Sequence, residues 1–117
     1  MATFEITNIA AALDKFEIEE GRDFLDQMLQ IFNKRIPSDI SEMEDALQNK
    51  DIETLKKKAH LIAGSMSSFM LSEGNQLASS LEKECNNNNT NAIISKTENL
   101  ILYLNVVLNY IAQNYEA

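Results

Sequence analysis

Apolar residues recur every three or four positions along most of this 117-residue chain. This spacing places apolar side chains along one side of an α-helix, because an α-helix has 3.6 residues per turn. The chain has only three glycines and one proline, so few positions favour a break in a helix. Leu, Ala, Glu, Lys, Gln and Met, which favour helix, are abundant. The sequence therefore predicts an all-α fold.

Short polar segments divide this pattern into one short helix and four long ones. The short amphipathic helix comes first, around residues 9–16. The next apolar series runs from Leu25 to Leu47 and keeps its phase on both sides of Pro37, so we expect one long helix with a kink there. Four long helices with short connections favour an antiparallel up-down four-helix bundle, with the short extra helix packed at one end. We expect one domain over residues 1–117.

The second long helix is expected to span about residues 51–70, with Asp51 as its N-cap. Its apolar stripe consists of Ile52, Leu55, Ala59, Ile62, Met66 and Phe69. Ser72 is expected to cap the third long helix, in which the inward-facing residues are Leu77, Leu81 and Cys85. Thr90 is expected to cap the last long helix, whose wide apolar face consists of Ile93, Leu100, Ile101, Leu104, Leu108 and Ile111.

The composition argues against several classes of partner. With 18 acidic and 10 basic side chains the net charge is −8, so nucleic acid and membrane surfaces are poor partners. Cys85 is the only cysteine, and the start of the chain lacks the pattern of a signal peptide, so we expect a soluble cytoplasmic protein. A monomer is expected, although Tyr103, Val106 and Val107 on the last helix leave open a dimer contact or docking patch.

The only histidine, His60, lies off the apolar stripe of its helix and is expected to point toward water. Its neighbours on the same side of the helix are Glu53, Lys56 and Lys57 before it, and Ala63, Gly64 and Ser67 after it. Glycine inside a helix costs about 1 kcal/mol relative to alanine, so Gly64 suggests that a partner approaches the helix closely beside His60. Ala63 and Ser67 extend this clearance, while Lys56 and Lys57 could reach an anion on the imidazole.

This pattern favours a histidine that transiently accepts an anion. An exposed imidazole is mostly neutral at pH 7 and has a nucleophilic nitrogen. No second histidine is present, so a metal site is not expected, and neither Ser65 nor Ser67 has an evident base for nucleophilic catalysis. The plainer interpretations are an incidental surface histidine and a solvated lysine face. For Lys58 the solvated face is our interpretation, while for Lys56 and Lys57 both interpretations stay open.

The segment Ala59–Ser65, which reads AHLIAGS, resembles the signature A-H-x-L-K-G-S of histidine-containing phosphotransfer (HPt) domains. The resemblance covers nearly the whole chain. It includes the positions of Phe24-Leu25, Met28-Leu29, Ala46-Leu47 with the following Asp51, and later Leu77, Leu81 and Glu82.

The resemblance implies a four-helix bundle on which His60 is the phosphoacceptor. In such domains the histidine accepts a phosphoryl group from a receiver-domain aspartate and passes it to another receiver in a multistep two-component phosphorelay. The partners implied are response-regulator receiver domains and a hybrid histidine kinase. The receiver would supply Mg²⁺, so no cofactor of the domain's own is expected. The domain would be a phosphocarrier without ATP-dependent kinase activity, which fits the absence of a Walker motif.

The chain departs from the family pattern at two positions. Ala63 stands where the family usually has a lysine, and we hypothesise from helix geometry that Lys56 or Lys57 compensates. Met70 stands where the family often has glycine, which is expected to affect only how the helix ends. Ala63 also favours an alternative, a pseudo-HPt module that docks receivers without carrying phosphate. A second alternative is the substrate domain of a larger chemotaxis-type histidine kinase, which would need ATP-binding and dimerisation sequence after Ala117.

Overall fold

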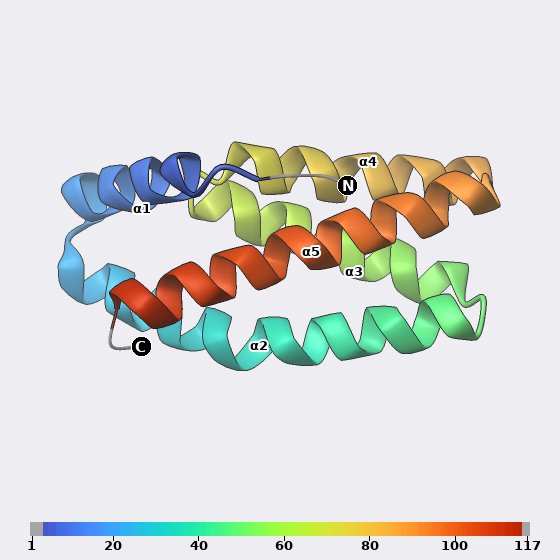
Figure 1. The fold of residues 1–117 in the computed structure, drawn as a ribbon, viewed down its shortest axis with the longest axis horizontal. Coiled ribbons are helices and arrows are strands. Elements are labelled where there is room, and N and C mark those ends of the chain that lie inside the picture. Colours follow the sequence, from blue (N-terminus) through green and yellow to red (C-terminus); the bar gives the residue numbers. More distant parts are fainter. Residues whose placement is uncertain (1–3, 116–117) are drawn as a thin grey trace.

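A computed structural model describes residues 4–115 of the chain, which form helices and short connections (Figure 1). The helices are α1 (Ile6–Glu20), α2 (Arg22–Gln48), α3 (Ile52–Ser68), α4 (Ser72–Asn87) and α5 (Thr90–Asn114). No strand occurs between residues 4 and 115. The prediction of an all-α fold is therefore confirmed.

The four long helices, α2 to α5, lie along the length of the molecule, and the chain reverses direction at each connection between them (Figure 1). Helix α3 packs against α2 and α4, and α5 packs against α4 and α2, so the four helices enclose a common core. Helix α1 packs against α2 and α5. It also reaches the connection between α3 and α4, where the rings of Phe16 and Phe69 lie 5.6 Å apart. At 15 residues α1 is longer than the sequence pattern predicted.

The predicted apolar stripes form the core. Every stripe residue of α3 from Leu55 to Phe69 is buried, and Ile52 is half-buried. In α2, Pro37 lies inside one helix as expected, and the apolar series is buried except for Met28 and Leu47, which are half-buried. On α5 the prediction was incomplete, because Tyr103 and Val107 are also buried. These two residues therefore belong to the core, and the suggestion that they leave room for a surface contact is wrong.

Two of the three predicted N-caps are displaced by one residue. Asp51 caps α3 as expected, since its carboxylate accepts a hydrogen bond from the Thr54 backbone N–H at 3.2 Å. Thr90 is instead the first residue of α5, and the side chain of Asn89 accepts from the Ala92 backbone N–H at 3.3 Å. Ser72 is likewise the first residue of α4, and the N-cap position is occupied by Leu71, which has no capping side chain.

Each connection between the long helices turns through a residue with left-handed backbone geometry. These residues are Lys50, Met70 and Asn88, with φ of 58°, 61° and 55°. After α3, Met70 N–H donates to the Ser67 carbonyl and Leu71 N–H donates to the Met66 carbonyl, at 3.0 and 2.9 Å. This is the hydrogen-bond pattern of a Schellman motif, which satisfies the last carbonyls of a helix. Because each turn is so short, neighbouring helices must run side by side.

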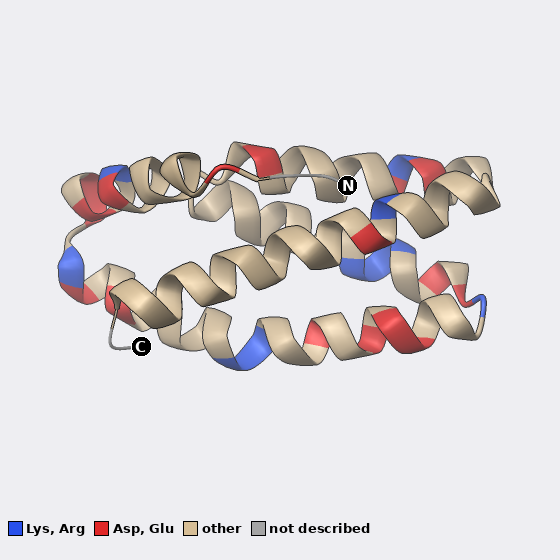
Figure 2. Ribbon diagram, viewed as in Figure 1, with Lys and Arg blue, Asp and Glu red and all other residues tan. Residues whose placement is uncertain are grey.

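Charged residues are unevenly distributed over the helices (Figure 2). Acidic residues gather in the second half of α2, close to the three consecutive lysines of α3. Residues 99–115 contain no Lys, Arg, Asp or Glu. Within the described chain, no helix combines the length and apolar character needed to cross a membrane.

Candidate functional site

Helix α3 presents His60 to solvent. The apolar stripe of α3 faces the core, and the His60 side chain lies on the other side of the helix with 73% of its surface exposed. The expectation that this histidine is not a core residue is confirmed. Because α3 is anchored on both sides by α2 and α4, the imidazole is carried by a rigid element.

Glu82 of α4 holds one nitrogen of the His60 ring. The Nδ1 atom lies 3.1 Å from Oε2 and 3.3 Å from Oε1 of the Glu82 carboxylate. An ionised carboxylate only accepts hydrogen bonds, so this contact places the proton on Nδ1 and leaves the lone pair of a neutral ring on Nε2. Nε2 has no hydrogen-bond partner among residues 4–115. The nitrogen that is free to react therefore points away from the bundle's own polar groups.

The predicted lysines lie beside the histidine. Lys56 and Lys57 line a shallow hollow together with His60, and the other residues around it are Glu53, Leu61 and Glu82. Lys57 is exposed and Lys56 is half-buried. The two ammonium groups are balanced by two carboxylates, so the hollow has no net positive charge while His60 is neutral.

Of the three positions expected to leave space beside His60, Gly64 and Ser67 are exposed and Ala63 is buried. A Cβ atom added at Gly64 would have no atom within 4 Å other than the backbone of its own helix, so open space lies over this position. Ser67 is exposed. Ala63 is buried, with 9% of its surface exposed, and its backbone carbonyl accepts a hydrogen bond from Asn75 of α4. Its placement on the solvent side was therefore wrong, because that flank of α3 is covered by α4.

Lys58 is not the solvated residue that the sequence suggested. Its ammonium group donates to the buried Asp39 carboxylate at 3.0 Å and also pairs with Glu42, both on α2. These hydrogen bonds, first that to Glu42 and then that to Asp39, raise the pKa of Lys58. The three consecutive lysines therefore divide their roles, because Lys58 ties α3 to α2 while its two neighbours border the hollow.

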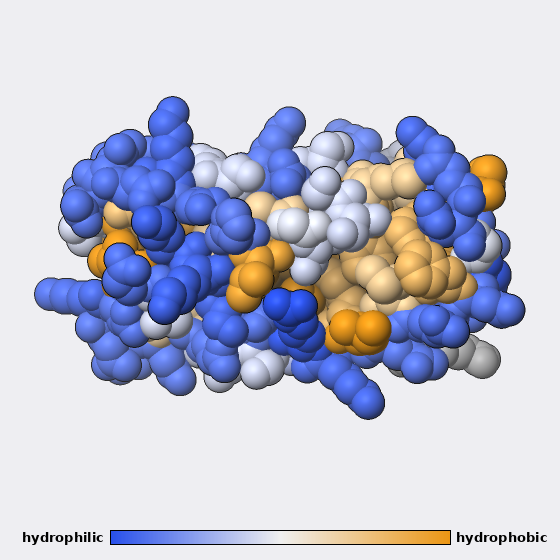
Figure 3. Space-filling view, turned by 180° about the vertical axis from the view of Figure 1, so that it is seen from behind, coloured by the Kyte–Doolittle hydropathy of each residue, from blue (hydrophilic) through white to orange (hydrophobic). Residues whose placement is uncertain are grey.

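An apolar surface adjoins the histidine on the side of α2. It includes a groove between α2 and α3 lined by Ile31, Phe32, Gly64 and other residues. Four large apolar side chains of α1, α2 and α3 are exposed, namely Ile18, Phe24, Ile31 and Leu61, of which Ile31 lines this groove. Seen from behind, the molecule has an apolar area toward the end formed by α1 and the start of α2 (Figure 3). We call these four side chains and the groove the apolar surface.

Glu82 is the site residue that sequence reasoning missed as a functional group. It was noted only as part of the resemblance, and it lies 22 positions from His60 in the chain. One signal was available, because Glu82 directly follows the inward-facing Leu81 and so must lie at an edge of α4 near a neighbouring helix. The identity of that neighbour depends on how α3 and α4 are aligned, which local spacing does not specify.

These features define a class of protein, an all-helical domain that offers one exposed, carboxylate-held histidine as an acceptor and has an apolar surface beside it. A family model, the Hpt domain, matches residues 27–111, which is more than half of the chain. The chain belongs to the Hpt domain family. Searches of curated proteins and of solved structures gave no match.

Membership of this family implies phosphotransfer in two-component signalling. Domains of the family interact with receiver domains and are phosphocarriers rather than kinases. In residues 4–115, no group of three or more His, Cys, Asp or Glu side chains is arranged to hold a metal ion.

Proposed function

We propose that His60 accepts a phosphoryl group from the aspartyl phosphate of one receiver domain and passes it to the aspartate of another. The observation that carries this proposal is the state of the imidazole, whose Nδ1 is held by Glu82 while Nε2 is open to a partner. A nucleophile that is fixed on a rigid helix needs little reorganisation to reach an in-line position for phosphoryl transfer.

In the proposed reaction the lone pair of His60 Nε2 attacks the phosphorus atom of the receiver's aspartyl phosphate. The N–P bond forms as the bond from phosphorus to the aspartate oxygen breaks, and the aspartate leaves as a carboxylate. The proton on Nδ1 stays in its hydrogen bond to Glu82. The carboxylate charge then offsets the positive charge that develops on the ring. Transfer to the second receiver is the reverse of these steps.

The partner completes the site in this proposal. The receiver supplies Mg²⁺ and docks over α3, and the apolar surface provides contacts from the end of α1 and the start of α2. Helices α2 to α5 act as the antiparallel up-down bundle that presents the histidine, and α1 is the additional N-terminal helix. The phosphorelay would operate in the cytoplasm, between a hybrid histidine kinase and a response regulator.

A second candidate is a module that binds receivers without carrying phosphate. The balanced charges of the hollow favour it, because Glu53 and Glu82 offset Lys56 and Lys57 and no lysine occupies position 63. Phosphorylation adds about −1.5 to −2 of charge, which a hollow without net positive charge stabilises poorly. The open Nε2 of His60 favours the carrier. The two candidates differ in whether the protein becomes phosphorylated by a receiver, which can be measured.

The deciding experiment incubates the protein with a receiver domain that carries a radiolabelled aspartyl phosphate. The carrier takes up an acid-labile, base-stable label, and the His60→Gln variant takes up none. Glu82→Ala is expected to slow uptake by about tenfold or more, because loss of a group that orients a functional histidine commonly has an effect of that size. If wild-type protein binds receivers by titration calorimetry but acquires no label from them, the carrier proposal is wrong and the binding module is supported.

A further inference from the structure

Two side-chain hydrogen bonds join α3 to α4 in the described part of the chain. One is the contact between His60 and Glu82. In the other, the Asn75 side-chain amide donates to the backbone carbonyl of Ala63 at 2.9 Å. On α3, His60 and Ala63 are about one helical turn apart, and on α4, Asn75 and Glu82 are about two turns apart. Both bonds therefore lie along the same seam between the helices.

The Asn75 bond is directed at a carbonyl in the middle of a helix. Such a carbonyl already accepts the backbone N–H of the residue four positions later, so the amide uses its second lone pair. This bond closes no helix end and extends no turn. The bond fixes the axial position of α4 relative to α3, because it joins a side chain of α4 to the backbone of α3.

The packing next to Asn75 brings the helices close together. A Cβ atom added at Gly74 would lie 2.6 Å from Cε2 of Tyr103 and 2.8 Å from Cγ of Met66, distances that real Cβ atoms do not show. The start of α4 can therefore rest on α3 and α5 only because Gly74 has no side chain. Gly74 therefore determines how closely α4 approaches α3 and α5, and Asn75 determines the axial position of α4 along α3.

We propose that Asn75 is a positioning residue for His60, which acts by holding Glu82 in register with the imidazole. The apolar contacts along the seam are non-directional, so they permit small axial shifts of α4, whereas a hydrogen bond is directional. The Nδ1–Oε2 distance of 3.1 Å lies at the long end of the usual range and the Nδ1–Oε1 distance of 3.3 Å lies just beyond it, so a small shift of α4 weakens this contact. The consequence for phosphoryl transfer rests on the proposed function, but the consequence for the ring proton does not.

The test reads the ring proton directly. His60 is the only histidine, so ¹⁵N-labelled protein has one pair of ring nitrogens, and their chemical shifts at mildly alkaline pH report the ratio of Nδ1–H to Nε2–H forms. Asn75→Ala is expected to lower this ratio at least about twofold, the lower end of coupling within one hydrogen-bond network. Asn75→Asp, which keeps the shape but loses the donor, is expected to lower it as well and replaces Asn75→Ala if that variant does not fold.

Two comparisons separate positioning from general loss of stability. Gln76→Ala changes the exposed neighbour on the same helix, and Leu77→Ala removes half-buried apolar surface from α4 without touching the Ala63 carbonyl. Both are expected to leave the ratio unchanged. In a Glu82→Ala background, Asn75→Ala is expected to have no further effect, because it acts through Glu82. The inference is wrong if Asn75→Ala changes the ratio of Nδ1–H to Nε2–H forms equally with and without Glu82. It is also wrong if neither Asn75 variant changes this ratio.

The outcome for the proposed function is read separately. If wild-type protein takes up no label from receivers, the carrier proposal is wrong. The ¹⁵N spectra still decide, independently of that result, whether Asn75 affects the position of the ring proton. If wild-type protein is labelled and the ratio does not respond to Asn75, only this inference fails. If both hold, Asn75→Ala also slows labelling, and Gln76→Ala does not.

Discussion

The immediate surroundings of His60 contain as many negative charges as positive ones. Two lysines and two glutamates line its hollow, and the position one turn after the histidine is occupied by the buried methyl group of Ala63. In the proposed transfer His60 gains about two negative charges, and the flexible ammonium groups of the preceding turn are placed to offset part of them. Removal of either lysine should therefore slow transfer, although less than removal of Glu82, which holds the imidazole itself.

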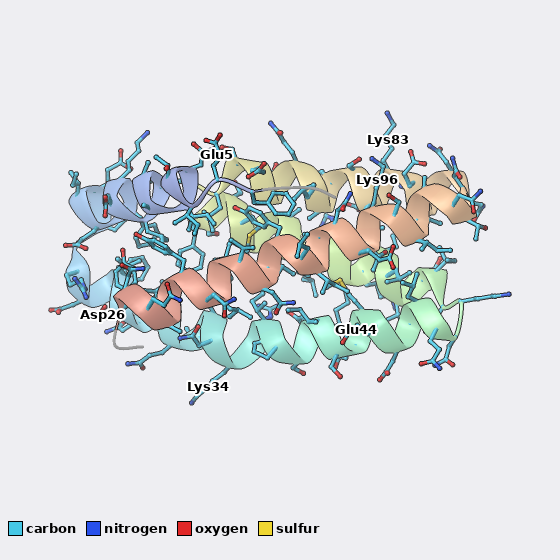
Figure 4. All side chains as sticks on the ribbon, in the orientation of Figure 1. Glu5, Asp26, Lys34, Glu44, Lys83 and Lys96 are labelled. Carbon is cyan, nitrogen blue, oxygen red and sulfur yellow. The ribbon has the colours of Figure 1, made fainter. Side chains whose placement is uncertain are left out.

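We expect Lys56→Ala and Lys57→Ala each to slow phosphoryl uptake by His60 several-fold, and the double variant to slow it further. The physical reason is the loss of positive charge beside a dianionic group in an otherwise acidic protein. The measurement is single-turnover uptake from a phosphorylated receiver. Lys34→Ala is the matched control, because Lys34 projects from α2 away from the bundle (Figure 4). Unchanged rates in both single variants and the double variant would rule out compensation by these lysines.

The turn between α3 and α4 places a methionine where the backbone favours glycine. Met70 has φ of 61°, and left-handed geometry costs about 1–2 kcal/mol for a residue with a Cβ atom. The Schellman hydrogen bonds around Met70 and the buried Leu71 hold this turn in place despite the strain. Lys50 ends α2 in the same way, and Asn88 ends α4 with a residue type that tolerates the geometry better.

Met70→Gly and Lys50→Gly are each expected to raise the free energy of unfolding by about 0.5–1 kcal/mol, measured by urea denaturation. Relief of the left-handed strain outweighs the greater flexibility that glycine gives to the unfolded chain. Asn88→Gly serves as the comparison and should change stability less. A loss of stability in both of the first two variants would show that these turns do not store the strain assigned to them.

The start of α3 makes part of the stability depend on pH. Hydrogen bonds from the Thr54 hydroxyl and then from its backbone N–H lower the pKa of Asp51. A carboxyl group with a lowered pKa in the folded state contributes stability above its unfolded pKa, and this contribution is lost as pH falls through the folded value. Helix α3 therefore becomes easier to unfold in acid at the end that leads toward His60.

Asp51→Asn keeps an oxygen that can cap the helix but does not titrate. We expect the stability advantage of wild-type protein over this variant to shrink as pH is lowered from about 6 to about 2, as followed by urea denaturation at each pH. Glu44→Gln is the control, since Glu44 is exposed on α2. A wild-type advantage over Asp51→Asn that stays constant over this range would contradict the capping argument.

The molecule as a whole has an acceptor and an apolar surface on adjoining parts of α3 and α2. One helical turn of α3 separates His60 from Gly64, and Gly64 lines the groove together with Ile31. A receiver that docks on the apolar surface is therefore brought to the histidine across the open space at Gly64. The net charge of −8 disfavours docking of an acidic partner on the acidic parts of the surface.

Ile31→Ser is expected to weaken receiver binding about tenfold or more and to slow transfer at low receiver concentration. Ile31 is 57% exposed, so the substitution removes apolar contact with the partner while leaving the core intact. Ile94→Ser on α5 is the matched control, because Ile94 is also exposed but lies outside the apolar surface. Binding is measured by titration calorimetry. Equal effects of the two substitutions would show that the receiver does not dock over α2 and α3.

The sequence was sufficient to predict what depends on neighbouring residues along one helix. The helical class, the core stripe of α3, the single helix through Pro37 and the exposure of His60 all follow from apolar spacing. The contacts between helices could not be predicted in this way. Glu82 on Nδ1 and Lys58 between two carboxylates depend on the alignment of α3 with α4 and α2, and the burial of Ala63 depends on which flank α4 covers.

The short connections between the helices have a consequence for how this protein is degraded. Proteases cut backbone that can be drawn out into an extended strand, and exposed loops usually provide it. Here one glycine separates α1 from α2, and the later connections at residues 49–51, 69–71 and 88–89 are tightly hydrogen-bonded turns. Cleavage between residues 4 and 115 therefore has to wait for a helix to open. The rate of digestion would thus measure how often the bundle opens, and receiver binding should slow it.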